Sequence, residues 1–144
     1  MKKLISVTVI LLFIGLAFAP SIDANEEIIS YSNFLIEIQN ITGGFGIHAD
    51  VVSGTHKNLT EVEWKISFSS GGWLLIGKQR TGMIDTLHAG ETIKIWSFVF
   101  GIFGRGLPYD IRFSIFYEDA EIYQRDAIAE VVGPFVRDVR VDPH

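Results

Sequence analysis

The chain has 144 residues, of which 48% are hydrophobic, a formal net charge of −5 and no cysteine. Its length fits one domain with a short terminal segment, and its apolar content excludes intrinsic disorder. The lack of cysteine excludes disulfides, thiolate metal sites and cysteine nucleophiles, and an acidic chain without a basic stripe argues against nucleic acid as a partner.

The N-terminus has the pattern of an export signal. Met1 to Lys3 is positively charged, and Leu4 to Ala19 is an almost uninterrupted apolar run with a small-x-small cleavage pattern at its end. Pro20 disfavours a cut after Ala19, and a cut after Ala24 is the substitute. The alternative is a retained membrane anchor, although the run spans only about 24 Å as a helix and a hydrocarbon core is about 30 Å thick. Both alternatives place the body outside the cytoplasm, either secreted or anchored through residues 4–19.

Beyond this segment, apolar and polar residues alternate with the period of a β-strand. The predicted inward-facing rows are Phe45, Ile47, Ala49 and Val51; Val62, Trp64, Ile66 and Phe68; and Ile111, Phe113, Ile115 and Tyr117. Turn signals recur along the chain, and no segment has a convincing helical stripe. Trp64 is the natural core anchor, because an indole can bury roughly 200 Å².

The pattern predicts an all-β fold of about seven to nine strands, an immunoglobulin-like two-sheet antiparallel sandwich that follows an N-terminal hydrophobic signal or anchor helix. An antiparallel barrel is the alternative. We divide the chain into a signal peptide or membrane anchor (1–24), a linker (25–33), the sandwich (34–136) and a strand-like or loose C-terminal tail (137–144).

Several turn glycines and core residues form a recognisable series. They are Thr42-Gly43-Gly44-Phe45-Gly46, Val62-x-Trp64-x-Ile66, Gly71-Gly72, Leu87-x-x-Gly90-Glu91 and Gly133-Pro134-Phe135. This series, over about residues 34 to 136, resembles archaeal exported domains similar to the cell-adhesion-related (CARDB-type) immunoglobulin-like modules. The resemblance implies an extracellular adhesive or structural role, and it offers no catalytic residues to carry over.

Few residues point to chemistry. His48 and Asp50 share a predicted outward strand face, but a zinc site needs a third ligand, which among the histidines only His56 or His88 could supply. We interpret the pair as a solvated face. The carboxylates interpreted in the same way, as solubilising turn and tail residues, are Asp119, Glu121, Asp138 and Asp142. No nucleophile–base motif occurs, and the glycines of residues 101–106 lack the end of a phosphate loop. We therefore predict no enzymatic activity, no cofactor and no metal site.

Aromatic residues gather around the glycine-rich corner and are the candidates for a contact surface. We select Trp96, Phe103 and Tyr109 as contact residues, and Trp73, after Gly71-Gly72, as a platform for a sugar ring. The alternative is that the strand predicted over residues 92–100, which is apolar on both faces, is covered on both faces within the fold.

Two tripeptides match the N-glycosylation pattern, at Asn40 and at Asn58, and both lie beside predicted turns. Together the observations predict a non-enzymatic, extracytoplasmic surface module that mediates protein–protein contact or adhesion, with envelope proteins or a second copy as partner. The alternative is a module that binds carbohydrate or another small ligand.

Overall fold

The computed structural model describes residues 36–102 and 107–143. The predicted signal or anchor, the linker and Phe103 lie outside the described residues. The strands are β1 (Ile36–Thr42), β2 (Gly44–Phe45), β3 (Ile47–Ser53), β4 (Leu59–Ser69), β5 (Trp73–Ile76), β6 (Gln79–Leu87), β7 (Thr92–Ser97), β8 (Phe100–Ile102), β9 (Tyr109–Tyr117), β10 (Ala120–Val132) and β11 (Phe135–Val141). No helix long and apolar enough to cross a membrane is found in these two ranges.

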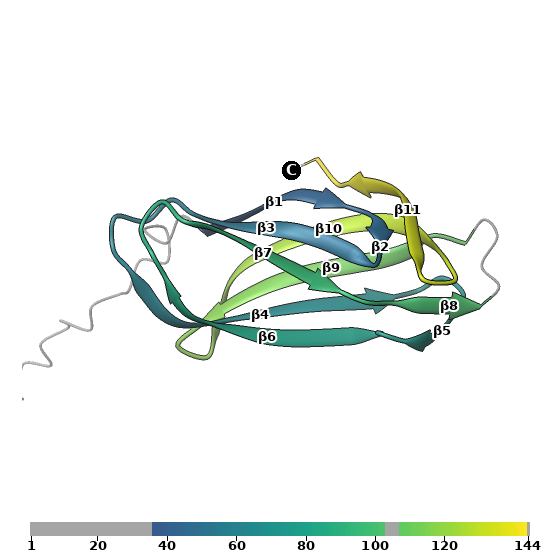
Figure 1. The fold of residues 1–144 in the computed structure, drawn as a ribbon, viewed down its shortest axis with the longest axis horizontal. Helices are drawn as coiled ribbons and strands as arrows, with labels where there is room; N and C mark the ends of the chain where they lie inside the picture. Colours follow the sequence, from purple (N-terminus) through teal and green to yellow (C-terminus); the bar gives the residue numbers. More distant parts are fainter. Residues whose placement is uncertain (1–35, 103–106, 144) are drawn as a thin grey trace, which may run out of the picture. The chain divides into compact units, whose positions relative to one another are not determined.

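The strands form three antiparallel sheets. Their orders are β1-β3-β7, β2-β11-β10-β9-β4-β6 and β5-β8. Figure 1 shows the three-stranded sheet lying over the six-stranded sheet, with the short β5–β8 pair at one end of both. The prediction of an all-β fold is confirmed, and the arrangement is sandwich-like.

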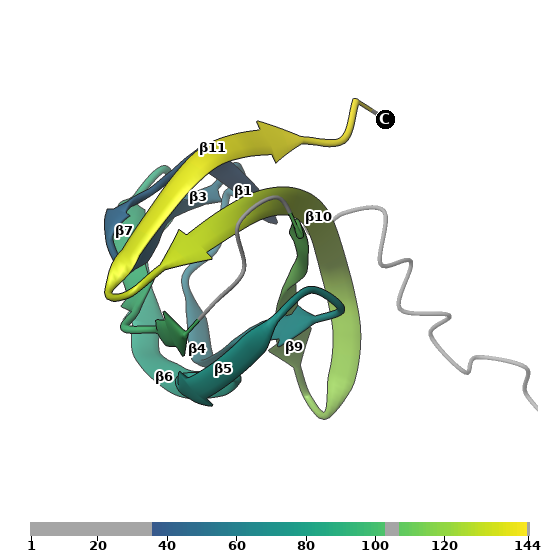
Figure 2. The ribbon, with the colours of Figure 1, turned by 90° about the vertical axis from the view of Figure 1, so that its right-hand side faces the viewer.

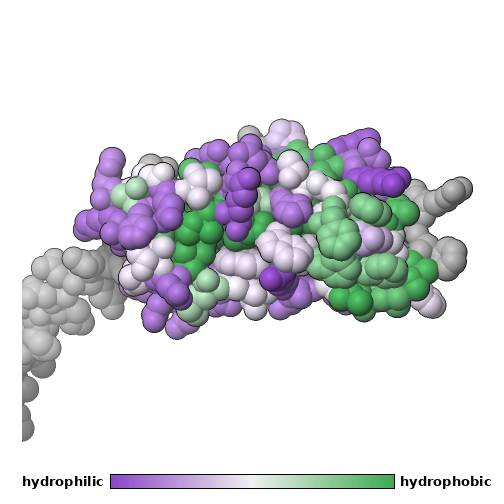
Figure 3. Space-filling model, viewed as in Figure 1, coloured by the Kyte–Doolittle hydropathy of each residue, from purple (hydrophilic) through white to green (hydrophobic). Residues whose placement is uncertain are grey.

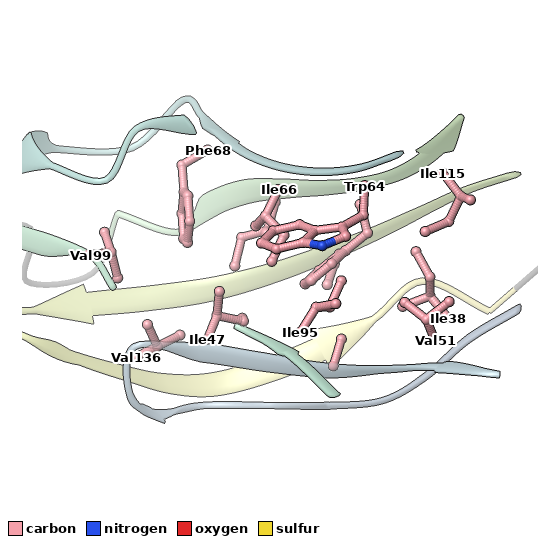
Figure 4. Close-up of a cluster of buried hydrophobic side chains, with 14 of the residues drawn as sticks. Ile38, Ile47, Val51, Trp64, Ile66, Phe68, Ile95, Val99, Ile115 and Val136 are labelled. Atoms are coloured by element: carbon pink, nitrogen blue, oxygen red, sulfur yellow. The ribbon is translucent and has the colours of Figure 1, made fainter. Parts of the chain in front are cut away.

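The core lies between the two larger sheets and is built from the alternating rows (Figure 4). Val62, Ile66 and Phe68 of β4 are buried, and Trp64 beside them is only 8% exposed. The indole of Trp64 lies within the cluster of side chains that comes from both sheets. The predicted inward face of β4 and its tryptophan anchor are therefore confirmed.

Two crossings join the sheets at the end of the fold where β5 and β8 lie. β2 lies between β1 and β3 in sequence, but it pairs with β11 of the other sheet. In the second crossing, β8 follows β7 of the three-stranded sheet in sequence but pairs with β5. β5 itself lies in sequence between β4 and β6 of the six-stranded sheet. Viewed from this end in Figure 2, strands surround the core. We call this end of the fold the closed end.

The first crossing changes one predicted row. Ile47, Ala49 and Val51 are buried as expected, but Phe45 is 57% exposed. Gly46 has a φ of +81°, which interrupts the strand between β2 and β3 and resets the alternation. The expectation that Phe45 faces inward was therefore wrong.

The strand count also exceeds the expected seven to nine. The two crossings produce β2 and β8 as short separate strands, and β6 is one continuous strand from Gln79 to Leu87. β11 runs to Val141 and pairs with β10 from Ala127 onward, within the segment expected to be strand-like or loose. The short strands β2 and β8 have too few residues for a period-two pattern to mark them as separate strands, and crossing strands bury only part of one face.

Candidate functional site

Large apolar side chains gather, exposed, at the closed end of the fold. They come from β2, from β5 and β8, from the residues just before β9 and from the β10–β11 turn. Their members are Phe45, Trp73, Leu75, Ile76, Ile102, Leu107, Val132 and Phe135. We call this set the apolar end, and Figure 3 shows hydrophobic side chains gathered near this end on the face that it draws.

Backbone pairing makes this surface continuous. Trp73 lies opposite Ile102 in the β5–β8 pair. Gly101 of β8 exchanges two 3.0 Å backbone hydrogen bonds with Gly133 in the β10–β11 turn. On the other side of that turn Phe135 pairs with Phe45. Apart from Leu107, which precedes β9, the exposed side chains thus sit on one connected framework of strands.

Aromatic contacts extend the surface towards β7. The ring centroid of Phe45 lies 5.2 Å from that of Phe98 and 6.3 Å from that of Phe135. These are tilted and edge-on arrangements of the kind that aromatic pairs prefer. Phe45 is therefore held in place between two rings while much of its own surface faces solvent.

Trp73 is the most exposed member of the apolar end, at 81%. It follows the Gly71-Gly72 turn and begins β5, whose sequence Trp-Leu-Leu-Ile carries no charge. No member of the apolar end is charged. The surface can therefore offer dispersion and apolar burial to a partner, but few hydrogen bonds.

Trp96 belongs to a different cluster. The guanidinium carbon of Arg80, a residue of β6, lies 4.6 Å from the ring centroid of Trp96 and 6.0 Å from that of Trp64. The Arg80 side chain therefore reaches from the edge strand β6 to the edge strand β7. The ring centroid of His48 lies 6.3 Å from that of Trp96, and the two ring planes are stacked with 18° between them. Although Trp96 is 43% exposed, its ring already has partners within the fold.

Tyr109 is part of the core at the closed end and is only 1% exposed. Its ring lies so close to Gly71 that a Cβ there would approach it to 2.8 Å. Burial raises the pKa of the Tyr109 hydroxyl above its ordinary value of 10.0, and this hydroxyl has no hydrogen-bond partner among the described residues. Tyr109 was predicted to be a contact residue, but its side chain is shielded from solvent in the described part of the chain.

Of the four predicted contact residues, only Trp73 lies free at the apolar end, and Phe103 is outside the described residues. Sequence reasoning missed the exposure of Leu75, Ile76 and Phe135. One signal was available for β5: four apolar residues in a row cannot all face inward on a strand whose side chains alternate.

Both glycosylation candidates are exposed and use their side-chain amides locally. Asn40 lies in a β-bulge with a φ of +49° and donates from Nδ2 to Asp50 Oδ2 at 2.9 Å. Asn58 Oδ1 accepts a hydrogen bond from the backbone N–H of Ala89 at 3.1 Å. A glycan is attached at Nδ2, so at Asn40 it would compete with the hydrogen bond to Asp50, whereas at Asn58 the accepting Oδ1 would remain available.

The polar candidates do not form a metal-binding group. His48 Nε2 lies 3.1 Å from the carbonyl oxygen of Phe45, and Asp50 accepts from Asn40. Within residues 36–102 and 107–143, no three His, Asp or Glu side chains come together in a way that could hold an ion.

A groove of about 400 Å³ opens between β1 and β10 and is lined in part by Tyr123 and Arg125.

Comparison of the chain with family models, with curated proteins and with solved structures finds no match. The indications of function therefore come from the chemistry of the chain itself.

Proposed function

We propose that this chain is a non-enzymatic, extracytoplasmic surface module with an immunoglobulin-like sandwich fold, and that it docks protein through its apolar end. The observation that carries the proposal is the gathering of eight exposed large apolar side chains at one end of the fold, seven of them on connected strands. Such a gathering is unusual on a soluble domain, where exposed apolar residues are normally scattered.

The exposed area supports docking. A large apolar or aromatic side chain has roughly 150–250 Å² to bury. With the eight members exposed to between 36% and 81%, the apolar end presents about 800 Å², the contribution of one partner to a standard protein–protein interface. Monomeric proteins typically expose patches of about 300–600 Å² at most.

The chemistry of the surface favours protein over carbohydrate. A sugar needs hydrogen-bond partners for its hydroxyls besides a ring to stack on, because a buried hydroxyl without a partner costs about 1–3 kcal/mol. The side chains of the neighbouring members Leu75, Ile76 and Ile102 offer none, and the backbone groups on the edge of β5 that no described strand pairs with are spaced for another strand. An apolar protein surface has no such requirement.

The location is proposed from the sequence. The basic start and the apolar run of residues 4–19 have the pattern of an export signal or an anchor. The resemblance to CARDB-type modules points the same way, towards an adhesive or structural role outside the cytoplasm.

Site-specific photo-crosslinking of the full chain in an envelope preparation tests this function. A photoreactive phenylalanine analogue replaces Trp73 in one variant and Met83 in a control, because Met83 is a 61% exposed apolar residue outside the apolar end. We expect protein adducts from position 73 and none from position 83. Adducts to glycan alone, or equal adducts from both positions, would refute docking of protein at the apolar end.

A further inference from the structure

We infer that a second copy of this chain occupies the apolar end, with the β5 strands of the two copies pairing antiparallel about a two-fold axis. This inference rests on the proposed function, since it names the partner of the same surface. Three features of the closed end support it: a free strand edge, an uncharged sequence and a short sheet that extension would stabilise.

β5 has an open edge. It pairs with β8 on one side, and its other side has no strand neighbour among the strands of residues 36–102 and 107–143. An edge strand presents unpaired backbone N–H and C=O groups, and natural proteins protect such edges with charges, proline or bulges. Trp73 to Ile76 contains neither charge nor proline, although the pairing with β8 is shifted between Leu74 and Ile76. The edge is thus available to another strand.

The β5 sequence is compatible with itself. A two-fold interface buries the same surface of both copies, so a charge near the axis would lie close to its own copy. The chain as a whole carries a net charge of −5, which would repel a second copy over most of its surface. β5 and the other members of the apolar end carry no charge, so this is a surface where two copies can meet without like-charge repulsion.

Pairing also extends an incomplete sheet. β5 and β8 form a two-stranded sheet that is joined to the β10–β11 turn through the Gly101–Gly133 bridge, and additional strands stabilise so short a sheet. Antiparallel pairing of β5 with its copy gives a four-stranded sheet in the order β8-β5-β5-β8. The exposed side chains of Trp73, Leu75 and Ile76 would then lie beside those of the partner. The whole apolar end, with its eight members, has about 800 Å² per copy to bury, which is the area of a standard interface.

The absence of cysteine makes a direct test possible. Leu75→Cys and Met83→Cys are introduced separately into the full chain, which is purified in a mild detergent and oxidised. The two positions are matched, being 57% and 61% exposed and aliphatic in character. A disulfide requires Cα atoms about 4.4–6.8 Å apart, a distance reached only by residues near the two-fold axis. We expect a covalent dimer from Leu75→Cys and a monomer from Met83→Cys.

The mass of the particles gives a second measurement. Multi-angle light scattering should give a dimer for the unmodified full chain and a monomer for Leu75→Arg, in which two like charges meet across the axis and weaken dimerisation by about 100-fold or more. Met83→Arg is the matched control and should remain a dimer. Circular dichroism of Leu75→Arg checks that the sheets remain formed.

The outcomes separate this inference from the function on which it rests. A monomeric unmodified chain that still forms protein adducts at position 73 would overturn the self-pairing and leave docking of another protein in place. A dimer that persists in Leu75→Arg, or that crosslinks equally at position 83, would place the contact elsewhere and overturn the inference. A monomer that forms no protein adduct but floats with phosphatidylcholine vesicles would overturn both.

Discussion

The packing of Trp64 against Gly82 gives a quantitative test of the core. The two residues lie directly opposite each other in the β4–β6 pair. A Cβ on Gly82 would lie 2.4 Å from Cζ2 and 2.5 Å from Cε2 of the indole, well inside van der Waals contact. The indole is rigid and enclosed by core residues, so it cannot move aside freely. We expect Gly82→Ala to lower the free energy of unfolding by about 1–3 kcal/mol, the usual cost of overpacking.

A double-mutant cycle isolates the contact. Trp64→Leu alone leaves a cavity and costs about 2–5 kcal/mol, but it also removes the ring atoms that the new methyl group of Gly82→Ala would strike. The double variant should therefore lose less than the sum of the two single losses, with a coupling of about 0.5–3 kcal/mol. Urea unfolding followed by far-ultraviolet circular dichroism measures all four free energies without relying on tryptophan fluorescence.

Gly90→Ala is the control for this cycle. Gly90 has a φ of +74° and no atom within 4 Å of a built Cβ, so its replacement costs backbone strain but touches nothing. Its effect should add to that of Trp64→Leu to within about 0.5 kcal/mol. If Gly82→Ala were equally additive with Trp64→Leu, the close approach of the indole would not be the reason for glycine at position 82.

Three further predictions concern other parts of the fold. Arg80→Gln should shift the fluorescence of Trp96 and cost about 0.5–1 kcal/mol, because the guanidinium over that ring is lost; unchanged emission would contradict the contact. Glu118 and Asp119 both have positive φ in the β9–β10 turn. The double replacement Glu118→Asn with Asp119→Gly should therefore raise the free energy of unfolding by about 1 kcal/mol, which a higher midpoint of thermal unfolding would report. Because the pKa of Tyr109 is raised in the folded state, the unfolded state loses its proton first, and stability should fall as the pH rises above 10.0. Tyr109→Phe should remove that part of the alkaline decline in urea titrations.

The central strands could be predicted from sequence because each has two different faces. In β4 from Val62 to Phe68 and in β9 from Tyr109 to Phe113, one face meets the core and the other is more exposed, so burial alternates with a period of two. Val62, Ile66 and Phe113 are all fully buried, as their spacing indicates. The local pattern is sufficient there because these segments have a paired strand on each side.

The closed end could not be predicted, because its pairings join segments that are distant in sequence. Trp73 meets Ile102, and Phe45 meets Phe135, through crossings that no local pattern encodes. The same crossings decide which aromatic residues remain outside. Tyr109 is buried because Gly71 lets the backbone approach its ring, and Trp96 is covered by Arg80 from the neighbouring edge strand.

The apolar end is larger than the fold itself requires. A strand that only closes the core needs one apolar face, and Leu74 provides it in β5 by packing against the buried cluster. Leu75 is 57% exposed and buries little apolar surface within the chain. Its replacement by serine should therefore change the free energy of unfolding by no more than about 0.5 kcal/mol, as for an ordinary surface substitution. If Leu75→Ser unfolded the domain, the residue would be serving the fold, and its exposure could no longer be taken as a sign of a partner.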